Sequence, residues 1–442
     1  MVMTIINKLA NQEARIGIVG LGYVGLPLGL GFIANKYKVL GLDVDPKKVD
    51  LINQGESYIE HIAGNTIKDA VDSGFLTASI DFSDAASCDA LILCVPTPLN
   101  RHHEPDLSYV VNTIDSLLPY LKKGQALSLE STTYPGTTEE ILRPKIEGQG
   151  FTIGEDFYLL YSPEREDPGN IQFSAVNIPK VMGGATEACQ EVGVALYNAV
   201  VEEVVPVSST KVAEFSKLLE NIYRSVNIGL VNELKVAADR MGIDIWEVIE
   251  AAKTKPFGFK AFYPGPGLGG HCIPIDPFYL TWKAKEYGVH TRFIELAGEI
   301  NESMPSYVVQ KVGVALNSKA KPVNGSKVLL LGLAYKEDVD DMRESPTFHL
   351  MDGLRELGAQ VDFYDPHIPV IPPSREHADW TGCKSVEWNA EVVGSFDCVV
   401  IATNHSRFNL KELVEYADLI VDTRNALSTS EIESRPGQLY KA

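Results

Sequence analysis

The chain has 442 residues, of which 45% are hydrophobic and 22% are charged, which are the proportions of a folded globular protein. This length exceeds what one ordinary core supports, so two or three domains are expected. The formal net charge of −20 argues against nucleic acid or an anionic membrane surface as a partner, because both would be repelled. An anionic substrate would therefore need basic residues concentrated at one place.

The cysteines are far apart in the sequence, with no CxxC pair and no Cys/His spacing typical of a metal site. We therefore expect neither a disulfide framework nor a structural zinc, and we expect no metal in the active site. Residues 1–14 have no apolar core of signal-peptide length, and no apolar run is long enough to span a membrane. A soluble, cytoplasmic protein is predicted. The six cysteines are Cys88, Cys94, Cys189, Cys272, Cys383 and Cys398.

The N-terminal region has the order of a dinucleotide-binding unit. A short apolar strand, 15–19, is followed by Gly20-x-Gly22-x-x-Gly25, an apolar helix and a second strand, 38–42, that ends at Asp43. Asp43 lies 43 − 25 = 18 residues after the last glycine, as this fingerprint requires. Its carboxylate can hold both ribose hydroxyls and would repel a 2′-phosphate, so NAD rather than NADP is predicted.

Three further apolar strands, 90–95, 125–130 and 158–161, each end in a polar turn. Ligands of open parallel sheets bind beyond the carboxyl ends of the strands, so these turns are expected to line the cofactor cleft. The threonines in them are equally well explained as turn formers. Glu164, in the third turn, is either a catalytic base or a solvated side chain.

Helical periodicity extends from Thr210 to Met241, followed by Gly242 as a stop signal. A helix this long, apolar on several sides, is expected to be covered by more than one neighbour, to join two domains and to contribute to a subunit interface. Lys217 and Asn221 are one turn apart on it. They are either functional, or a snorkelling lysine and a structural hydrogen bond. The apolar positions are Val212, Phe215, Leu218, Leu219, Ile222, Tyr223, Val226, Leu230, Val231 and Leu234.

The segment 265–277 holds four glycines and three prolines around Cys272, with His271 before it and Asp276 four residues after it. Such a composition forms neither helix nor strand and predicts a constrained loop whose backbone can approach a ligand closely. A thiol in this setting is placed for chemistry. The alternative is a buried cysteine that acts as a small hydrophobe.

The remaining elements are a helix at 245–252, helical periodicity after Ile275 to about Leu316, and a linker at 321–325. A second strand-first unit follows, without GxGxxG, with strands 327–332, 360–364, 398–402 and 419–421 and a helix 346–357. Lys336 and Arg343, close to the start of that helix, form a candidate pyrophosphate clamp. The fold class is therefore α/β, with two Rossmann-like doubly wound domains joined by a long central helix and a helical middle domain. The boundaries that we expect are 1–209 for the NAD domain, 210–320 for the middle domain and 321–442 for a C-terminal α/β domain, to which the resemblance described next assigns the UDP-sugar.

Taken together, these motifs resemble those of the NAD-dependent nucleotide-sugar 6-dehydrogenases, a family that includes UDP-glucose and UDP-N-acetylhexosamine dehydrogenases. The resemblance covers the chain from Ile16 to about Asn425 in one motif order. Besides the glycine motif it is carried by Glu130-Ser131-Thr132, Ser162-Pro163-Glu164-Arg165, Lys217-x-x-x-Asn221, Gly269-Gly270-x-Cys272-x-x-x-Asp276, Lys336, Arg343-x-Ser345-Pro346 and Asp422-x-Arg424.

The resemblance implies a role for each matching residue. The expected catalytic residues are Cys272, Lys217, Asn221, Asp276, Thr132 and Glu164. The expected NAD-binding residues are Gly20, Gly22, Tyr23, Val24, Gly25, Asp43, Lys48, Pro96, Thr97 and Thr132. The expected substrate-binding residues are Glu164, Arg165, Lys217, Asn221, Tyr263, Gly267, Gly269, Lys336, Arg343 and Arg424.

The implied reaction is a four-electron oxidation of the sugar C6 alcohol to a carboxylate with two NAD⁺. Cys272 would trap the aldehyde as a thiohemiacetal and later carry a thioester. Lys217, or a water that it holds with Asn221 and Thr132, would take the first proton. Either Asp276 or Glu164 would activate the hydrolytic water, and this choice stays open.

The loop details favour the UDP-N-acetylhexosamine branch of the family. The UDP-glucose branch has a second glutamate where this chain has Pro168, and a lysine where it has Ile275. Within the favoured branch we expect UDP-N-acetylglucosamine as substrate, a role in surface polysaccharide synthesis, and a homodimer or higher homo-oligomer. UDP-glucose, UDP-GalNAc and UDP-ManNAc are alternative substrates. The rival functions are a single-step dehydrogenase of the hydroxyacid type and a non-catalytic NAD-binding regulator.

Overall fold

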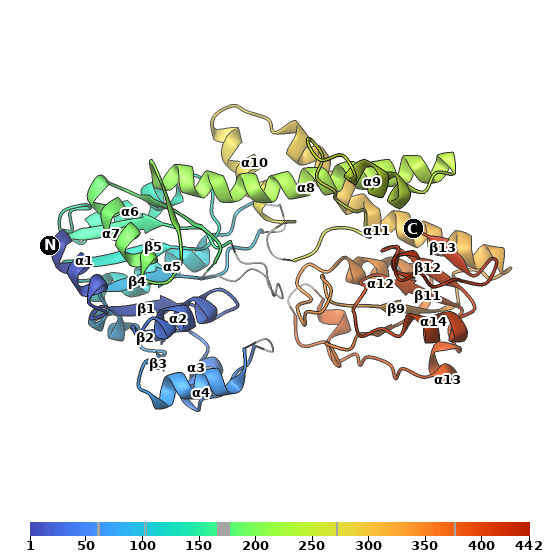
Figure 1. The fold of residues 1–442 in the computed structure, drawn as a ribbon, viewed down its shortest axis with the longest axis horizontal. Coiled ribbons are helices and arrows are strands. Elements are labelled where there is room, and N and C mark those ends of the chain that lie inside the picture. The colour runs from blue at the N-terminus through green and yellow to red at the C-terminus, as the bar shows by residue number, and fades with distance from the viewer. Residues whose placement is uncertain (60–61, 101, 103, 166–176, 271–272, 375–376) are drawn as a thin grey trace. The chain divides into compact units, whose positions relative to one another are not determined.

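The computed structural model describes residues 1–59, 62–100, 102, 104–165, 177–270, 273–374 and 377–442. The chain divides into two compact units (Figure 1). The first consists of Met1–Glu220 and Phe278–His290, and the second of Asn221–Pro277 and Thr291–Ala442.

The first unit is built on one sheet with the strand order β3-β2-β1-β4-β5-β6-β7-β8 among the described residues. All neighbouring strands are parallel except β6 and β7, which are antiparallel. Strands β5 and β6 are buried along their whole length, as expected for central parallel strands that are covered on both faces. The strands are β1 (Arg15–Val19), β2 (Lys38–Leu42), β3 (Leu76–Ser79), β4 (Ala90–Leu93), β5 (Gln125–Leu129), β6 (Phe157–Tyr161), β7 (Lys180–Gly184) and β8 (Val204–Val207).

The helices of the first unit connect these strands. Glycines with a positive φ, such as Gly55, Gly74 and Gly124, lie in the connections between these helices and strands. The helical segments are α1 (Val2–Ala10), α2 (Gly25–Ala34), α3 (Pro46–Asn53), α4 (Gly64–Asp72), η1 (Phe82–Ser87), α5 (Ser108–Leu117), η2 (Leu118–Tyr120), η3 (Thr138–Leu142), α6 (Arg143–Glu147) and α7 (Glu187–Asn198).

The second unit contains a sheet in which every described neighbouring pair is parallel, in the order β10-β9-β11-β12-β13. Its strands are β9 (Lys327–Leu331), β10 (Gln360–Tyr364), β11 (Cys398–Ile401), β12 (Ile420–Asp422) and β13 (Leu439–Lys441). Its helical segments are α9 (Ile245–Lys253), α11 (Arg292–Ser318), α12 (Pro346–Glu356), η4 (Ala378–Trp380), α13 (Ala390–Val393), α14 (Leu410–Tyr416) and α15 (Ala426–Thr429). The predicted fold class is confirmed: two Rossmann-like α/β domains with a helical region between them in the sequence.

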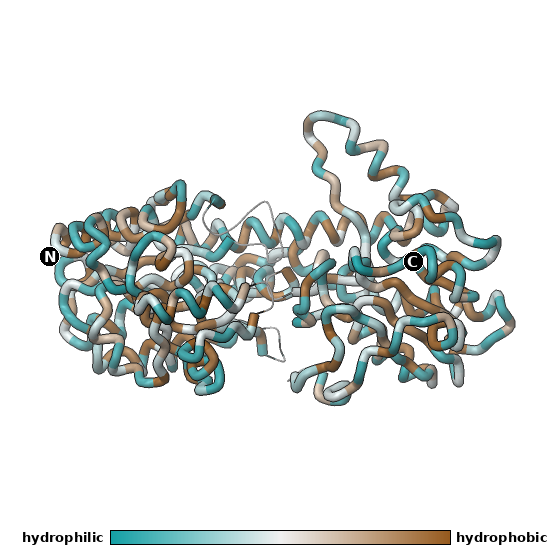
Figure 2. Tube along the Cα trace, turned by 60° about the horizontal axis from the view of Figure 1, so that its bottom comes forward, coloured by the Kyte–Doolittle hydropathy of each residue, from teal (hydrophilic) through white to brown (hydrophobic). Residues whose placement is uncertain are grey.

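Helix α8 (Thr210–Met241) begins and ends where the periodicity predicts. Its apolar positions differ in burial, and Ile222 and Val226 are half-buried. Leu218 and Val231 are buried, whereas Val212, Phe215, Leu219, Tyr223, Leu230 and Leu234 are each between 43% and 58% exposed. Figure 2 shows both hydrophobic and hydrophilic residues along this helix. The described part of the chain therefore does not cover these six side chains, and the expected contribution of α8 to a subunit interface stays a prediction.

The helical periodicity after Ile275 is interrupted. The structure has α10 (Asp276–Glu286) and then α11, with a turn between them at Gly288, whose φ is +70°. Glycine adopts this left-handed conformation without the steric cost that a Cβ brings, so it ends the helix. None of the helices in the described ranges combines the length and apolar character that a bilayer crossing requires.

Candidate active site

The glycine turn after β1 has the geometry of a pyrophosphate cradle. Gly20 has a φ of +96°, and a Cβ there would lie 2.5 Å from the carbonyl oxygen of Cys94. A Cβ on Gly25 would lie 1.9 Å from the carbonyl oxygen of Gly20, so the helix packs against the turn only because side chains are absent. A Cβ on Gly22 would meet no atom within 4 Å, which leaves its backbone open to an incoming phosphate.

Helix α2 begins at Gly25 without a side-chain cap, and Val24 precedes it. Its first N–H groups can therefore bind an anion, a use that the helix dipole favours. Tyr23, also expected at the cofactor, is half-buried in the same turn. Open backbone, uncapped helix and left-handed glycine together fit the diphosphate of a dinucleotide.

Asp43 follows β2 directly and is buried. One carboxylate oxygen accepts a hydrogen bond from the backbone N–H of Leu21 at 2.8 Å, and the other accepts from that of Asp45 at 2.9 Å. The ammonium of Lys48 lies 3.6 Å from the same carboxylate. Asp43 thus ties the glycine turn to the end of β2, a structural role that the motif spacing does not reveal.

The turns after β4 and β5 are held together by Ser131. Its hydroxyl donates to the carbonyl of Val95 at 2.7 Å and accepts from the N–H of Val95 at 3.0 Å. This ties the turn that holds Pro96 and the buried Thr97 to the turn that holds the half-buried Thr132, in the first unit. The structure therefore brings together two of the expected cofactor turns.

A buried charged cluster lies directly behind the Thr132 turn. The ammonium of Lys180 is 2.8 Å from a carboxylate oxygen of Glu130, and the hydroxyl of Tyr197 donates to the other oxygen at 2.6 Å. Burial lowers the pKa of Lys180, but the carboxylates of Glu130 and Glu164 outweigh burial and raise it above its usual value. Sequence reasoning missed this cluster, since its members are 50 and 67 residues apart.

Lys217, on α8, is buried, and its ammonium donates to the carbonyl oxygen of Glu164. The guanidinium of Arg165 pairs with Glu220, on the same helix, at 2.8 Å. One oxygen of Glu164 also accepts from the backbone N–H of Arg165 at 2.6 Å. Lys217, Glu164 and Arg165 are therefore together in the first unit.

In the second unit, Asn221 and Asp276 are both almost fully buried, and the Asn221 amide donates to the Asp276 carboxylate. Arg224 donates to the Asn221 oxygen. Asp276 is the first residue of α10, where the helix dipole favours a negative charge. Cys272, the expected nucleophile, and His271 are outside the described residues.

The glycine loop before Asp276 rests on other parts of the second unit. Asn232, on α8, accepts from the N–H of Gly265 at 3.0 Å and donates to Asn301, on α11, at 2.9 Å. A Cβ on Gly269 would lie 2.7 Å from Tyr335, and a Cβ on Gly267 would lie 3.1 Å from Pro346. These glycines therefore allow the loop to pack closely against the protein itself. The sequence pattern predicted close approach to a ligand and did not indicate this packing.

The basic residues of the C-terminal domain already have partners within the chain. Arg343 forms a two-pronged pair with Asp341, with separations of 2.6 to 3.0 Å. The Nε of Arg424 donates to the carbonyl of Ala402 at 2.7 Å, and its guanidinium faces Gly265, where a Cβ would lie 2.5 Å from Nη1. Lys336 is half-buried in the turn after β9.

Tyr263, expected at the substrate, is 42% exposed in the second unit. Its hydroxyl donates to Glu250 at 2.5 Å and accepts from Lys253 at 3.2 Å. Its side chain is therefore fixed by α9.

Family models match three successive parts of the chain. They are the NAD-binding domain of the UDP-glucose/GDP-mannose dehydrogenase family at residues 14–201, its central domain at 211–303, and its UDP-binding domain at 329–429. UDP-N-acetyl-D-glucosamine 6-dehydrogenase of Pseudomonas aeruginosa is 35% identical over 432 residues, which is 96% of this chain and 100% of that protein. The chain belongs to the UDP-glucose/GDP-mannose dehydrogenase family.

Two further members of the family illustrate the range. UDP-N-acetyl-D-mannosamine dehydrogenase of Methanococcus maripaludis strain C7 is 34% identical over 404 residues, covering 90% of this chain and 88% of that protein. The structure of UDP-D-ManNAc dehydrogenase from Pyrococcus horikoshii superposes with a TM-score of 0.85 at 32% identity, covering 97% of this chain and 98% of that one.

The predicted family and cofactor are confirmed: the chain is an NAD-dependent nucleotide-sugar 6-dehydrogenase. The residues of the first unit fit NAD: the glycine turn and α2 are suited to hold its diphosphate, and Asp43 and Lys48 remain the residues expected at its adenosine ribose. The UDP-binding domain corresponds to the part of the second unit that carries Lys336, Arg343 and Arg424.

Proposed function

We propose that this enzyme oxidises C6 of UDP-N-acetylglucosamine to the uronic acid, through a thiohemiacetal and a thioester on Cys272. The observation that supports this most is the buried hydrogen bond between Asn221 and Asp276 in the second unit. Burial of an amide and a carboxylate costs free energy, which their hydrogen bond offsets only in part, so a role in the reaction would explain their burial. Asp276 also follows Cys272 by only four residues.

NAD supplies the hydride acceptor when it is bound. The residues of the chain supply the proton and charge chemistry. Lys217 is buried and its described contact is a neutral carbonyl oxygen, which it can exchange for the sugar hydroxyl or for a water. As the neutral amine, or through that water, Lys217 takes the proton of the hydroxyl as the hydride leaves. A thiolate at Cys272 adds to the aldehyde and prevents its escape. Lys217 and the Asn221 amide stabilise the oxyanions that form.

Two carboxylates are candidates for the base that activates the hydrolytic water. Asp276 is buried and accepts from Asn221, which is compatible with holding a water in a fixed direction. Glu164 is only half-buried, and one of its oxygens accepts from its own loop. We favour Asp276. If Asp276 is the base, the covalent enzyme adduct should accumulate in Asp276→Asn. It should not accumulate in Glu164→Gln, which is the comparison variant.

The uridine nucleotide is proposed to bind the C-terminal domain through Lys336, Arg343 and Arg424. This concentrates cations for a dianion on a chain with a net charge of −20. Arg343 must share its guanidinium with Asp341, because its Nε and one Nη contact that carboxylate. Its fork of donors allows this sharing.

The choice of sugar rests on the relatives. The Pseudomonas aeruginosa protein is a UDP-N-acetyl-D-glucosamine 6-dehydrogenase, whereas the Methanococcus maripaludis protein is a UDP-N-acetyl-D-mannosamine dehydrogenase at nearly the same identity. The manno epimer is therefore the second candidate. A product of this kind serves surface polysaccharide synthesis in the cytoplasm, which we propose as the setting.

A substrate panel tests the proposal. UDP-GlcNAc, UDP-ManNAc, UDP-GalNAc, UDP-glucose and GDP-mannose are each supplied with NAD⁺ to the full chain, and NADH is followed. The highest kcat/KM is expected for UDP-GlcNAc. A higher value for UDP-ManNAc would correct the sugar, and activity with none of them would contradict the proposed function.

We also propose that two copies of the chain associate through α8. Phe215, Leu219, Tyr223, Leu230 and Leu234 form a stripe with spacings of four and seven residues and are each 45% to 58% exposed. An exposed apolar stripe of this length is typical of an interface. The solution mass, measured by light scattering, is expected to be at least twice that of the 48.4 kDa chain.

A further inference from the structure

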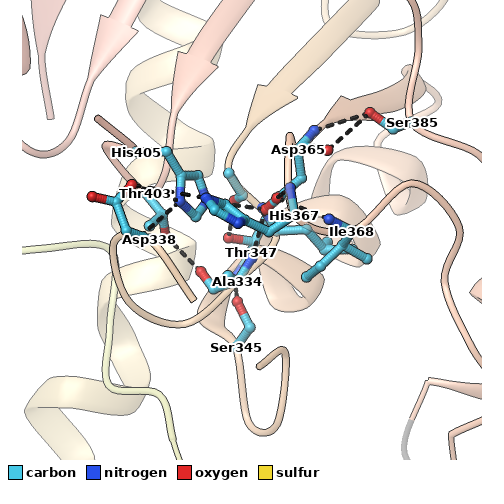
Figure 3. A network of polar contacts seen from close by, with 12 residues as sticks. Ala334, Asp338, Ser345, Thr347, Asp365, His367, Ile368, Ser385, Thr403 and His405 are labelled. Atoms are coloured by element: carbon cyan, nitrogen blue, oxygen red, sulfur yellow. Dashed lines mark hydrogen bonds and ion pairs between the residues drawn. The ribbon is translucent and has the colours of Figure 1, made fainter. Parts of the chain in front are cut away.

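Three side chains of the second unit converge at the carboxyl edge of its sheet (Figure 3). Asp338, His367 and His405 lie in the loops that follow β9, β10 and β11, which are adjacent in the sheet order. They are 367 − 338 = 29 and 405 − 367 = 38 residues apart, so no sequence spacing reveals them. Neither the proposed reaction nor the cofactor uses them.

The potential ligand atoms of this Asp338–His367–His405 cluster are close together. Nε2 of His367 and Nδ1 of His405 each lie 3.8 Å from Oδ1 of Asp338, and all three atoms are within 4.8 Å of one another. The centroids of the two imidazole rings are 4.9 Å apart. One carboxylate oxygen and two imidazole nitrogens therefore surround one point.

His367 provides an independent indication of a ligand. Its side chain is only 8% exposed, and its Nε2 is buried without any hydrogen-bond partner among the described residues. A buried polar nitrogen that lacks a partner is costly and is rare in folded proteins. This nitrogen lies beside Asp338, and a bound cation would satisfy it.

His405 already has the tautomer that ligation at Nδ1 requires. Its Nε2 faces Oδ2 of Asp365 at 3.1 Å, and that oxygen also accepts from the N–H groups of Leu333 and Ala334. Asp365 acts as an acceptor there, so Nε2 carries the proton and Nδ1 presents its lone pair. A carboxylate behind an imidazole in this way is the usual support of a metal-ligating histidine.

The lone pair on Nδ1 of His405 now accepts from the backbone N–H of Asp338 at 2.9 Å. A metal ion at the cluster would replace this hydrogen bond. Asp338 has a φ of +57°, a left-handed conformation that aspartate adopts more readily than most residues with a Cβ. Its Oδ1 accepts from the backbone N–H of Ser406 at 2.8 Å, a hydrogen bond that a carboxylate oxygen can keep while it binds a metal ion. Its carboxylate, 46% exposed, leaves the site open to solvent for ion entry.

We propose that Asp338, His367 and His405 bind one divalent transition-metal ion, of which Zn²⁺ is the best match, with a fourth position open to water. Two imidazoles and one carboxylate suit Zn²⁺, whereas Mg²⁺ and Ca²⁺ prefer oxygen ligands throughout. Ligand atoms around tetrahedral Zn²⁺ are about 3.3 Å apart, so the two 3.8 Å separations must shorten by about 0.5 Å. The proposal departs from the expectation drawn from the sequence, in which the spacing of Cys and His gave no sign of a zinc site.

The test is a titration of the metal-free full chain with Zn²⁺ by calorimetry and with Co²⁺ by visible absorption. His367→Gln is the informative variant, because Nε2 of His367 has no partner to lose in the described structure. His290→Gln, which changes an exposed histidine of the other unit, is the matched control. Circular dichroism verifies that each variant is folded.

The expected result is one Zn²⁺ per chain, bound at least about tenfold more weakly by His367→Gln and unchanged in His290→Gln. The Co²⁺ spectrum should lack a sulfur-to-metal band, since none of the ligands is a cysteine. Equal Zn²⁺ binding by wild type and His367→Gln, a sulfur band in the Co²⁺ spectrum of the one-equivalent complex, or no binding to the wild type would each overturn the proposal. Because metal binding is read without substrate, failure of the proposed function would not affect this result.

Discussion

Glu214 accepts two hydrogen bonds from Thr138, one from the backbone N–H at 2.9 Å and one from the hydroxyl at 2.7 Å. The second carboxylate oxygen accepts from the N–H of Gly136. Glu214 lies one helical turn before Lys217 on α8, and the turn that it holds begins at Thr132. One buried carboxylate therefore fixes the proposed proton acceptor relative to the threonine turn, within the first unit.

Glu214 should make stability depend on pH. Burial raises its pKa to about 7, and the hydrogen bonds from Gly136 and Thr138 offset this only in part. The pKa of Glu214 is higher in the folded than in the unfolded state. Ionisation of Glu214 therefore destabilises the folded state, fully above pH 7 and less and less as the pH falls toward 4.5. The full destabilisation is about 3 kcal/mol.

The comparison with Glu214→Gln isolates this effect. The wild-type free energy of urea unfolding, minus that of the variant, is expected to decrease as the pH rises from 4.5 to 7. The glutamine side chain does not titrate, so it changes the difference in unfolding free energy by the same amount at every pH. A difference that stays flat over this range, or that increases, would show that Glu214 is ionised throughout.

Removal of the buried cation at Lys180 should destabilise the first unit strongly. Lys180→Met leaves the fully buried Glu130 without its counter-charge, which is expected to cost about 3–5 kcal/mol. Tyr197→Phe removes the hydrogen bonds of one neutral hydroxyl, to Glu130 and with Ser128, and should cost about 1–3 kcal/mol. Lys68→Met, in an exposed pair with Asp72, is the control and should leave the urea midpoint unchanged. Similar midpoints for all three variants would contradict the cluster's role.

Asp43→Asn should weaken NAD binding and relax the exclusion of NADP. The amide cannot accept from both ribose hydroxyls as the carboxylate does, and it no longer repels a 2′-phosphate. Its loss of charge also weakens the contacts with Leu21 and Lys48. Dissociation constants for NAD and NADP, measured by fluorescence quenching, give the ratio of the two affinities. An unchanged ratio of NAD to NADP affinity would disprove the assignment of Asp43 to the ribose.

Gly265→Ala should impair nucleotide-sugar binding without affecting NAD. Its new Cβ would lie 2.5 Å from Nη1 of Arg424, so the guanidinium must move. A rise in KM for the UDP-sugar of about tenfold is expected, equivalent to about 1.4 kcal/mol, with KM for NAD unchanged. Gly64→Ala, at a position where a Cβ meets nothing within 4 Å, is the control. An unaltered KM for the UDP-sugar would argue that Arg424 does not contact the nucleotide.

The sequence predicts the elements whose pattern is local. Strand 38–42 and helix Thr210–Met241 have the expected bounds because a buried apolar run and a 3.6-residue period each signal their own structure. The antiparallel pairing of β6 with β7 carries no such signal. The break between α10 and α11 was missed although Gly288 marks it, because the apolar pattern continues on both sides.

The candidate site was predictable where residue type and short spacing suffice. Lys217, Glu164 and Arg165 meet in the first unit, and Asn221 meets Asp276 in the second. The supporting contacts were not predictable, because they join residues far apart in the chain, such as Glu214 with Thr138. The partners of Arg343 and Tyr263 are near them in the chain, but these contacts depend on side-chain direction, which the sequence order does not give.

The most direct test of the central claim is the number of NADH molecules formed per UDP-sugar consumed, compared between the wild type and Cys272→Ser. Two NADH and one carboxylate product are expected for the wild type. The variant should still bind NAD and the UDP-sugar but form no acid at steady state, since a hydroxyl at this position cannot replace the thiolate. One NADH per sugar with release of the aldehyde from the wild type, or normal acid formation by Cys272→Ser, would contradict the account.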